Sequence, residues 1–403
     1  MKEGARYQAV FELIREIFQD KTPADVLMNN YMKARRYIGS KDRRFILDTA
    51  WDIVRRRMRL SFDAGNDDPR KVLLFYLKDV DFDLITGGQY GLAPLSADEK
   101  KWLKSVKEKE DVYPLNVELE CPKWLFEKID NPPLIRSLNN PSSVDIRANF
   151  ISQTELKNRL KGEGLFFSLT PYSPHGLRSS ERININNCVA YKEGLFDLQD
   201  ESSQIAAVLI SPKPNEKIID YCAGAGGKSL AMAAELKNDG LIFCHDVNFN
   251  RMDAIKARAE RLGVKILKLI SKLTDSDFDC FVVDAPCSGT GTWRRAPDAK
   301  FRLTPSRLNE LQKIQSDVLE TAYHHTKSGG RIVYMTCSVL KSENEDVVES
   351  FVSKHDDISF DNHQDLWAKK IDAPYPFESS KYCSFSPLTT NTDGFFFCML
   401  KKQ

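Results

Sequence analysis

Two cysteines stand directly after apolar, strand-like segments in the second half of the chain. Residues 280–283 lead into Asp284-Ala-Pro-Cys287, and residues 331–335 lead into Thr336-Cys337-Ser338. In a parallel sheet the carboxyl ends of the strands share one edge, where ligands and catalytic groups gather. One buried cysteine is common in a core, but two cysteines at corresponding strand ends indicate a paired chemical role.

Such a pair suits methyl transfer to a pyrimidine carbon. Carbon 5 of cytosine is a poor nucleophile until a thiolate adds to carbon 6, after which carbon 5 can attack an electrophilic methyl group. One cysteine therefore needs thiolate character, and a second can help remove the carbon 5 proton and release the enzyme. Asp284 is placed to hydrogen-bond the ring nitrogen or the amino group of the base.

A glycine-rich loop lies upstream of the cysteines. Residues 217–220 read as a strand, and residues 221–228 (Tyr-Cys-Ala-Gly-Ala-Gly-Gly-Lys) turn directly into a helix. Glycines allow close approach of a ligand to the backbone, and a helix N-terminus presents free N–H groups. The loop alone is a weak signal, and the position of Lys228 does not fit a Walker A motif.

A second strand, residues 241–245, ends at Asp246, which lies 19 residues after Gly227. Doubly wound folds carry an acid at about this position that accepts hydrogen bonds from ribose hydroxyls. Asp246 also precedes a helix and could simply cap it. The glycine loop and the acid in register together favour nucleoside binding.

Composition bounds the class of protein. The chain has 403 residues, 42% apolar and 29% charged, which is typical of a globular protein with two or three domains. No apolar run approaches the ~18–20 residues of a membrane span, and the start lacks a secretory signal. The nine cysteines include no CxxC pair, which argues against a disulfide framework and against a zinc site. We expect a cytoplasmic monomer without a membrane segment or a metal.

Charge and periodicity divide the chain into three predicted segments. Residues 1–115 read as helical, residues 120–192 as a small α+β unit, and residues 193–403 as a doubly wound α/β domain, with residues 112–122 as a linker. Within residues 33–59 stand ten Lys or Arg and three Asp, a local net charge of +7. Such a stretch attracts phosphate, although a solvated helix face is an equally simple reading.

Other segments carry weaker expectations. Trp293-Arg294-Arg295, with Lys300 and Arg302, could bind RNA phosphate or form a solvated loop. A long helix is expected from Thr304 to the glycines 329–330. Residues 96–99 and residues 342–345 both read as capping boxes.

Four motifs resemble the Sun family of RNA cytosine-carbon-5 methyltransferases, and its bacterial 16S rRNA members most of all: CAGAGGK at 222–228, DAPCSGTG at 284–291, TCS at 336–338 and DGFFF at 393–397. The resemblance covers the chain from about residue 120 onward. IRAN at 146–149 is similar to an RNA-binding segment of the family. The N-terminal helices, with SKDRR at 40–44, resemble a NusB-like RNA-binding domain more loosely.

The resemblance implies roles for individual residues. Cys337, in the Thr-Cys motif, would be the nucleophile, and Cys287, in the Pro-Cys motif, would release the product. DNA cytosine methyltransferases use a Pro-Cys nucleophile instead, so the presence of both motifs favours RNA. S-adenosyl-L-methionine would contact Cys222, Ala223, Gly224, Ala225, Gly226, Gly227, Lys228, Asp246 on its ribose, Arg251 and Asp284, with Lys228 orienting Asp284 or the substrate.

The chain departs from the family pattern at two places. Ala225 replaces a proline, and residues 269–271 (Leu-Ile-Ser) stand where the family has Gly-Asp near the adenine. The sequence thus predicts a Rossmann-like S-adenosylmethionine methyltransferase acting on a cytidine of structured RNA, most simply 16S rRNA. Two alternatives stay open: the same chemistry on tRNA or 23S rRNA, and a catalytically silent RNA-binding assembly factor.

Overall fold

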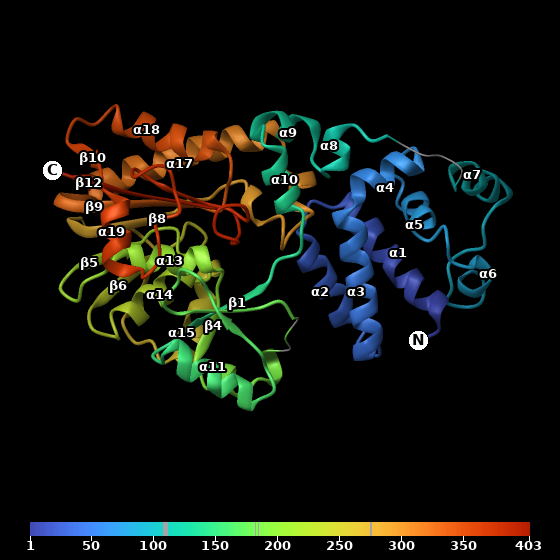
Figure 1. Ribbon diagram of the computed structural model, residues 1–403, viewed down its shortest axis with the longest axis horizontal. Helices are drawn as coiled ribbons and strands as arrows, with labels where there is room; N and C mark the ends of the chain where they lie inside the picture. The colour runs from blue at the N-terminus through green and yellow to red at the C-terminus, as the bar shows by residue number, and fades with distance from the viewer. Residues whose placement is uncertain (108–111, 182, 184, 275) are drawn as a thin grey trace. The chain divides into compact units, whose positions relative to one another are not determined.

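The computed structural model describes residues 1–107, 112–181, 183, 185–274 and 276–403 (Figure 1). They form two compact units, residues 1–140 with 293–304 and residues 141–292 with 305–403. No helix in this described part of the chain combines the length and apolarity of a membrane span. The division into functional domains at residues 1–115, 120–192 and 193–403 stays a prediction.

The first unit is all helical. Apolar residues at helical spacing, such as Leu13, Ile14 and Ile17, build its core. The predicted capping box is present, since Glu99 N–H donates to Ser96 Oγ (3.1 Å) and Ser96 N–H donates to Glu99 Oε2 (2.8 Å). Its helices are α1 (Glu3–Gln19), α2 (Ala24–Ala34), α3 (Ser40–Arg55), α4 (Arg57–Ala64), α5 (Pro69–Tyr76), α6 (Phe82–Ile85), α7 (Ala97–Lys107), α8 (Leu115–Glu118), α9 (Lys123–Ile129), α10 (Pro132–Leu138) and α16 (Ala299–Arg302).

Two expectations for this unit were wrong. The expected linker contains α8. Pro114 is the residue directly before this helix, and it has no N–H group that would need a hydrogen-bond partner there. The expectation for the basic segment around Lys300 fails at its buried residues, while Arg295 is exposed. Lys300 is 1% exposed and donates to Asn139 Oδ1 (2.9 Å), and burial lowers its pKa to about 8. Trp293 and Arg294 are buried as well.

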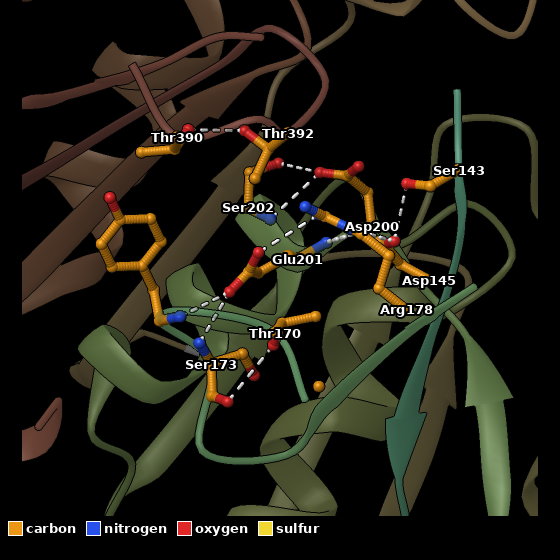
Figure 2. Close-up of polar contacts among 12 residues, drawn as sticks. Ser143, Asp145, Thr170, Ser173, Arg178, Asp200, Glu201, Ser202, Thr390 and Thr392 are labelled. Carbon is orange, nitrogen blue, oxygen red and sulfur yellow. Dashed lines mark hydrogen bonds and ion pairs between the residues drawn. The ribbon is translucent and has the colours of Figure 1, made fainter. Parts of the chain in front are cut away.

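A small antiparallel sheet opens the second unit, with strand order β2-β3-β1-β4. Its apolar face, including Ile146 and Leu177, packs on α11, while its polar face carries a buried network around Asp145 and Arg178 (Figure 2). The elements are β1 (Val144–Ala148), α11 (Gln153–Gly162), β2 (Ser168–Leu169), β3 (Gly176–Ser179), η1 (Ile185–Asn187), α12 (Val189–Lys192) and β4 (Phe196–Leu198).

The rest of the unit is a doubly wound α/β fold. Its sheet has the order β10-β12-β9-β8-β5-β6-β7, with β11 paired to β12. Strands β5 to β9 are parallel and β12 is antiparallel to β9. The strands are β5 (Lys217–Asp220), β6 (Leu241–His245), β7 (Leu267–Ile270), β8 (Phe278–Asp284), β9 (Thr326–Thr336), β10 (Ile358–Phe360), β11 (Cys383–Phe385) and β12 (Phe395–Lys402).

Helices cover both faces of this sheet (Figure 1). Successive strand residues alternate between two cores, one against α13, α14, α15 and α19, the other against α17 and α18. The chain order reverses at β5 and β8, so the loops after these strands lie at the switch point where such sheets bind ligands. The helices are α13 (Glu201–Ile210), α14 (Gly227–Glu235), η2 (Phe249–Met252), α15 (Asp253–Leu262), η3 (Thr290–Thr292), α17 (Pro305–His325), η4 (Lys341–Glu343), α18 (Glu345–Val352) and α19 (His363–Lys370).

Two local expectations fail here. Helix α17 ends at His325, and Gly329 (φ 77°) and Gly330 lie inside β9, beside an irregularity in its pairing with β8. A glycine pair marks a kink in a strand as readily as a helix end. The box at residues 342–345 does not form, because α18 starts after Asn344 without a side-chain cap.

Candidate active site

The two cysteines of the strand-end motifs are in contact. Strands β8 and β9 are adjacent and parallel, with Asp284 opposite Met335. Strand β8 ends at Asp284 and strand β9 ends at Thr336. Beyond these ends, Cys287 Sγ lies 3.4 Å from Cys337 Sγ. Residues 50 positions apart in the sequence thus present two sulfurs at one point.

The surroundings of the two sulfurs differ. The neighbouring Cys337 sulfur, burial and the Glu343 carboxylate all raise the pKa of the Cys287 thiol well above its usual value. Cys287 therefore holds its proton at neutral pH and can donate an S–H bond to Cys337.

Lys228 and Asp284 form an ion pair beside the sulfurs. Lys228 Nζ lies 2.8 Å from Asp284 Oδ2, and the ammonium is 4.8 Å from the centre of the Phe395 ring. Burial lowers the pKa of Lys228, but the negative charges of Asp284, Asp220 and Cys337 outweigh it, so the pKa is raised overall. The ammonium is therefore permanent at neutral pH and lies within electrostatic reach of Cys337.

The glycine loop begins where β5 ends. Cys222 is partly buried, and burial raises the pKa of its thiol, so it is not a reactive cysteine. Ala223 N–H donates to the His245 carbonyl (2.8 Å), which ties the loop to β6. Gly224 has a φ of 51°, and a Cβ there would lie 3.1 Å from Arg251 Nη2.

The second half of the loop starts α14. Gly226 has a φ of 79°, and a Cβ would lie 2.7 Å from Ile255 Cγ1, so only glycine fits. A Cβ on Gly227 would meet nothing within 4 Å, so the chain faces open space at this one position. The Ala225 carbonyl accepts a bond from Arg258. The loop is shaped for close approach of a ligand to its backbone.

Asp246 connects this loop to the end of β6. Its Oδ2 accepts from Gly224 N–H (2.9 Å) and from Arg251 Nη1 (3.3 Å), and its Oδ1 accepts from Asn248 N–H (2.9 Å). It does not cap η2, whose first preceding residue is Asn248. An ionised carboxylate can accept about four bonds, so Asp246 keeps capacity for a ligand hydroxyl.

Comparison with known proteins agrees with this geometry. A family described as 16S rRNA methyltransferase RsmB/F matches residues 207–401. A relative from Bacillus subtilis, named a probable ribosomal RNA small subunit methyltransferase B, is 29% identical over 72% of this chain and 68% of its own. One of the same name from Synechocystis is 27% identical over 98% of this chain and 99% of its own.

Residues 207–401 thus match the RsmB/F family of methyltransferases, and the relatives are similar over most of the chain. The solved structure of PH0851 is 24% identical, has a TM-score of 0.79 and covers 100% of both chains, which supports the fold. The Rossmann-like part of the predicted fold is thereby confirmed.

Sequence reasoning missed one group in this RsmB/F-family site. Glu343 is 0% exposed, and its carboxylate accepts bonds from the residues that follow both cysteines, Ser288 and Ser338. Glu343 lies six residues after Cys337. Its signal in the sequence was an acid close behind the Thr-Cys-Ser motif, which the expected capping box obscured.

A pair of glycines closes the site from the other side. Gly291 N–H donates to the Cys337 carbonyl (3.0 Å), and Gly394 N–H donates to the Gly291 carbonyl (2.8 Å). A Cβ on Gly291 would lie 2.0 Å from the Gly394 oxygen. Gly291 of the DAPCSGTG motif and Gly394 of the DGFFF motif thus both help to hold the turn that carries Cys337 in place.

Proposed function

We propose that this chain transfers a methyl group from S-adenosylmethionine to carbon 5 of a cytidine in 16S rRNA, through a covalent adduct with Cys337. It is an S-adenosylmethionine-dependent methyltransferase of ribosomal RNA by family. The reacting atom and the adduct rest on one observation, the contact of two differently placed sulfurs at the ends of β8 and β9.

The residues of the glycine loop fit the methyl donor. Gly227 leaves open space at the start of α14, and Asp246 keeps acceptor capacity for ribose hydroxyls. Bound there, S-adenosylmethionine supplies an electrophilic methyl group. Arg251 holds the Asp246 carboxylate in place, and we assign no residue to the adenine, because residues 269–271 lack the acid of the family pattern.

Cys337 is the proposed nucleophile. Its sulfur has an S–H donor on one side, Cys287, and the Lys228 ammonium within electrostatic reach. Both favour the thiolate that must add to carbon 6 of the base. After methyl transfer to carbon 5, Cys287 passes its own proton to the departing Cys337 sulfur and its sulfur takes the carbon 5 proton, as the bond between Cys337 and carbon 6 breaks.

Asp284 is the proposed partner of the base itself. It is part-exposed, follows directly on β8 and keeps one carboxylate oxygen beyond the Lys228 pair. From there it can accept a hydrogen bond from the cytosine amino group, or donate to the ring nitrogen when protonated. Lys228 fixes the orientation of this carboxylate.

RNA binding is assigned to the remaining segments. The N-terminal helices, proposed to be NusB-like, carry the +7 stretch of residues 33–59, which suits a phosphate backbone. The IRAN strand and its small sheet would lie beside the target nucleotide. A stacked base must leave its helix to reach Cys337, which costs a few kcal/mol and favours cytidines in loops.

A trapping experiment tests this proposal. Cys287→Ala protein is incubated with S-adenosylmethionine and unmodified 16S rRNA, and denaturing electrophoresis is used to look for a ribonuclease-sensitive slow band. We expect the band, because an adduct through Cys337 forms and is not released. The double variant Cys287→Ala/Cys337→Ala should give none, and wild-type product should contain 5-methylcytidine by nucleoside mass spectrometry.

The same gel separates the alternatives. A band with tRNA or 23S rRNA in place of 16S rRNA moves the substrate assignment and keeps the chemistry. If no RNA gives a band and wild-type transfers no methyl group, the two-cysteine mechanism is wrong. A silent assembly factor would then be the better reading, and it need not bind S-adenosylmethionine in a calorimetric titration.

A further inference from the structure

Glu343 bonds both cysteine turns with one carboxylate. Its Oε1 accepts from the Ser288 backbone N–H (2.8 Å) and from Gln315 Nε2 (3.0 Å). Its Oε2 accepts from the hydroxyls of Ser288 and Ser338, the latter at 2.6 Å. Ser288 directly follows Cys287 and Ser338 directly follows Cys337.

The frame around Glu343 is itself fixed. The Tyr334 hydroxyl donates to the Glu343 carbonyl (2.7 Å), and Asn344 Nδ2 donates to the Ser338 carbonyl (3.0 Å). Thr290 Oγ1 contacts Ser338 Oγ (3.0 Å) and accepts from Val339 N–H (3.0 Å). A change at the carboxylate is felt in both turns, because the same carboxylate accepts from Ser288 and from Ser338.

Simpler roles for this carboxylate do not fit. It is not the cap of α18, whose preceding residue is Asn344 and which has no side-chain cap. Its four donors are all uncharged, and no ion pair within the described residues includes it. The Glu343 carboxylate is also one of the groups that raise the pKa of the Cys287 thiol.

We propose that Glu343 is a positioning residue of the methyl transfer: its buried carboxylate holds the Cys287 and Cys337 turns together. The inference deepens the proposed function and rests on it for its catalytic meaning. The positioning itself concerns the free protein, so it can be tested without RNA or cofactor.

The first test measures the distance between the sulfurs. Dibromobimane bridges two neighbouring thiols, and peptide mass spectrometry identifies a Cys287–Cys337 bridge among the nine cysteines. We expect efficient bridging in wild-type protein and at least a fivefold slower reaction in Glu343→Ala, because the two turns are then free to separate. Glu349→Gln, an exposed carboxylate on α18, is the control and should match wild-type.

The second test measures turnover. A displacement of about 1 Å in a reacting group can lower a rate roughly 10²-fold, so Glu343→Ala should lower kcat by about that factor. KM for S-adenosylmethionine and for RNA should stay within about twofold, since Glu343 is assigned to neither. A rise in both KM values with unchanged kcat would overturn the positioning role.

The third test separates the charge from the geometry. In Glu343→Gln the amide oxygen can still accept from Ser288 N–H, and the amide nitrogen can donate to the serine hydroxyls, which rotate. We expect near wild-type bridging. The pH midpoint of Cys287 alkylation, measured in a Cys337→Ala background, should fall by about one unit or more, because a nearby negative charge is removed. An unchanged midpoint would overturn the assigned effect of the charge.

Each outcome bears on the positioning alone. If the trapping gel fails but bridging depends on Glu343, the positioning stands and the proposed reaction falls. If Glu343→Ala folds, by circular dichroism and thermal melting, and bridges like wild-type, the positioning is wrong. If it does not fold, Ser288→Ala/Ser338→Ala removes the two hydroxyl donors from a preserved carboxylate, and normal bridging and kcat in that variant would overturn the inference.

Discussion

Two glutamates of the second unit are both 0% exposed, yet they are satisfied in different ways. Glu201 accepts from the Tyr172 and Ser173 backbone N–H groups (2.7 and 2.9 Å) and forms an ion pair with Arg178 (3.2 Å), as Figure 2 shows. Glu343 accepts only from uncharged groups beside two thiols. One buried carboxylate has a cationic partner, and the other has none among the residues that the structure describes.

The difference indicates what each carboxylate does. Arg178 also binds Asp145 through two bonds (2.7 and 2.6 Å), so the Glu201 network joins the small sheet to α13. A neutralised, fully bonded cluster stabilises packing and perturbs little around it. Glu343, by contrast, bonds the two turns that carry Cys287 and Cys337, and it is one of the groups that raise the pKa of the Cys287 thiol.

The largest expected effect is on stability at Glu201. Glu201→Ala leaves two backbone N–H groups unbonded and part of the Arg178 charge uncompensated, so the free energy of unfolding should fall by about 3 kcal/mol. Urea denaturation measures it. The folded variant should still bridge Cys287 and Cys337 at the wild-type rate, in contrast to Glu343→Ala. Equal loss of bridging in both variants would remove the distinction between the two glutamates.

A third buried carboxylate, Asp220, is satisfied less well than either glutamate. Its Oδ2 accepts from Ser229 Oγ (2.6 Å), while its Oδ1 has no hydrogen-bond partner among the described residues. Burial raises its pKa to about 7, and the Asp284 charge adds to this against the Ser229 bond. The folded protein therefore binds the proton more tightly than the unfolded chain, whose aspartate pKa is about 3.9.

The sign of the resulting pH dependence follows. The stabilising contribution of protonated Asp220 is fully present below about pH 4 and is lost as pH rises through about 7. Asp220→Asn stays uncharged, so it should be more stable than wild-type by about 2 kcal/mol at pH 8 and by much less at pH 5. Urea denaturation at both pH values checks this. Exposed Asp239→Asn is the control, and a difference independent of pH would contradict the assignment.

The sequence could predict the parts of the site that are local. The glycine loop is adjacent to its strand and helix, and both cysteines directly follow apolar segments, so parallel-strand geometry alone brings them to one edge. Glu343 could not be found this way, because its bond to Ser288 spans 55 residues. Its neighbours in the sequence resemble a capping box, and only the three-dimensional structure shows that the Glu343 side chain is buried.

The local sequence gave a wrong prediction at two further places, in each case because tertiary contacts are not visible in it. Lys300 reads as solvent-exposed because charged side chains usually are, but its ammonium lies 5.7 Å from the centre of the Trp293 ring and donates to Asn139. Gly329 and Gly330 read as a helix end, but the helix stops earlier at His325. In both cases tertiary contacts overrode a sound local preference.

The smallest expected effect concerns the cation that balances this site. Lys228→Met removes the ammonium that pairs with Asp284 and lies in reach of Cys337. Since a nearby cation favours a thiolate, alkylation of Cys337 by iodoacetamide at pH 7 should slow by about tenfold, which corresponds to about 1.4 kcal/mol. Peptide mass spectrometry assigns the alkylated cysteine.

Two control variants show whether the effect of Lys228→Met comes from the loss of this particular charge. Lys272→Met removes an exposed ammonium beyond β7 and should leave the rate unchanged, while Lys228→Arg keeps the charge and should restore most of it. If Lys228→Met alkylates Cys337 at the wild-type rate, the thiolate is not supported by this cation. The bare Glu343 charge and the S–H bond from Cys287 would then have to account for the difference between the two sulfurs, and Glu343→Gln would become the variant with the larger effect on Cys337.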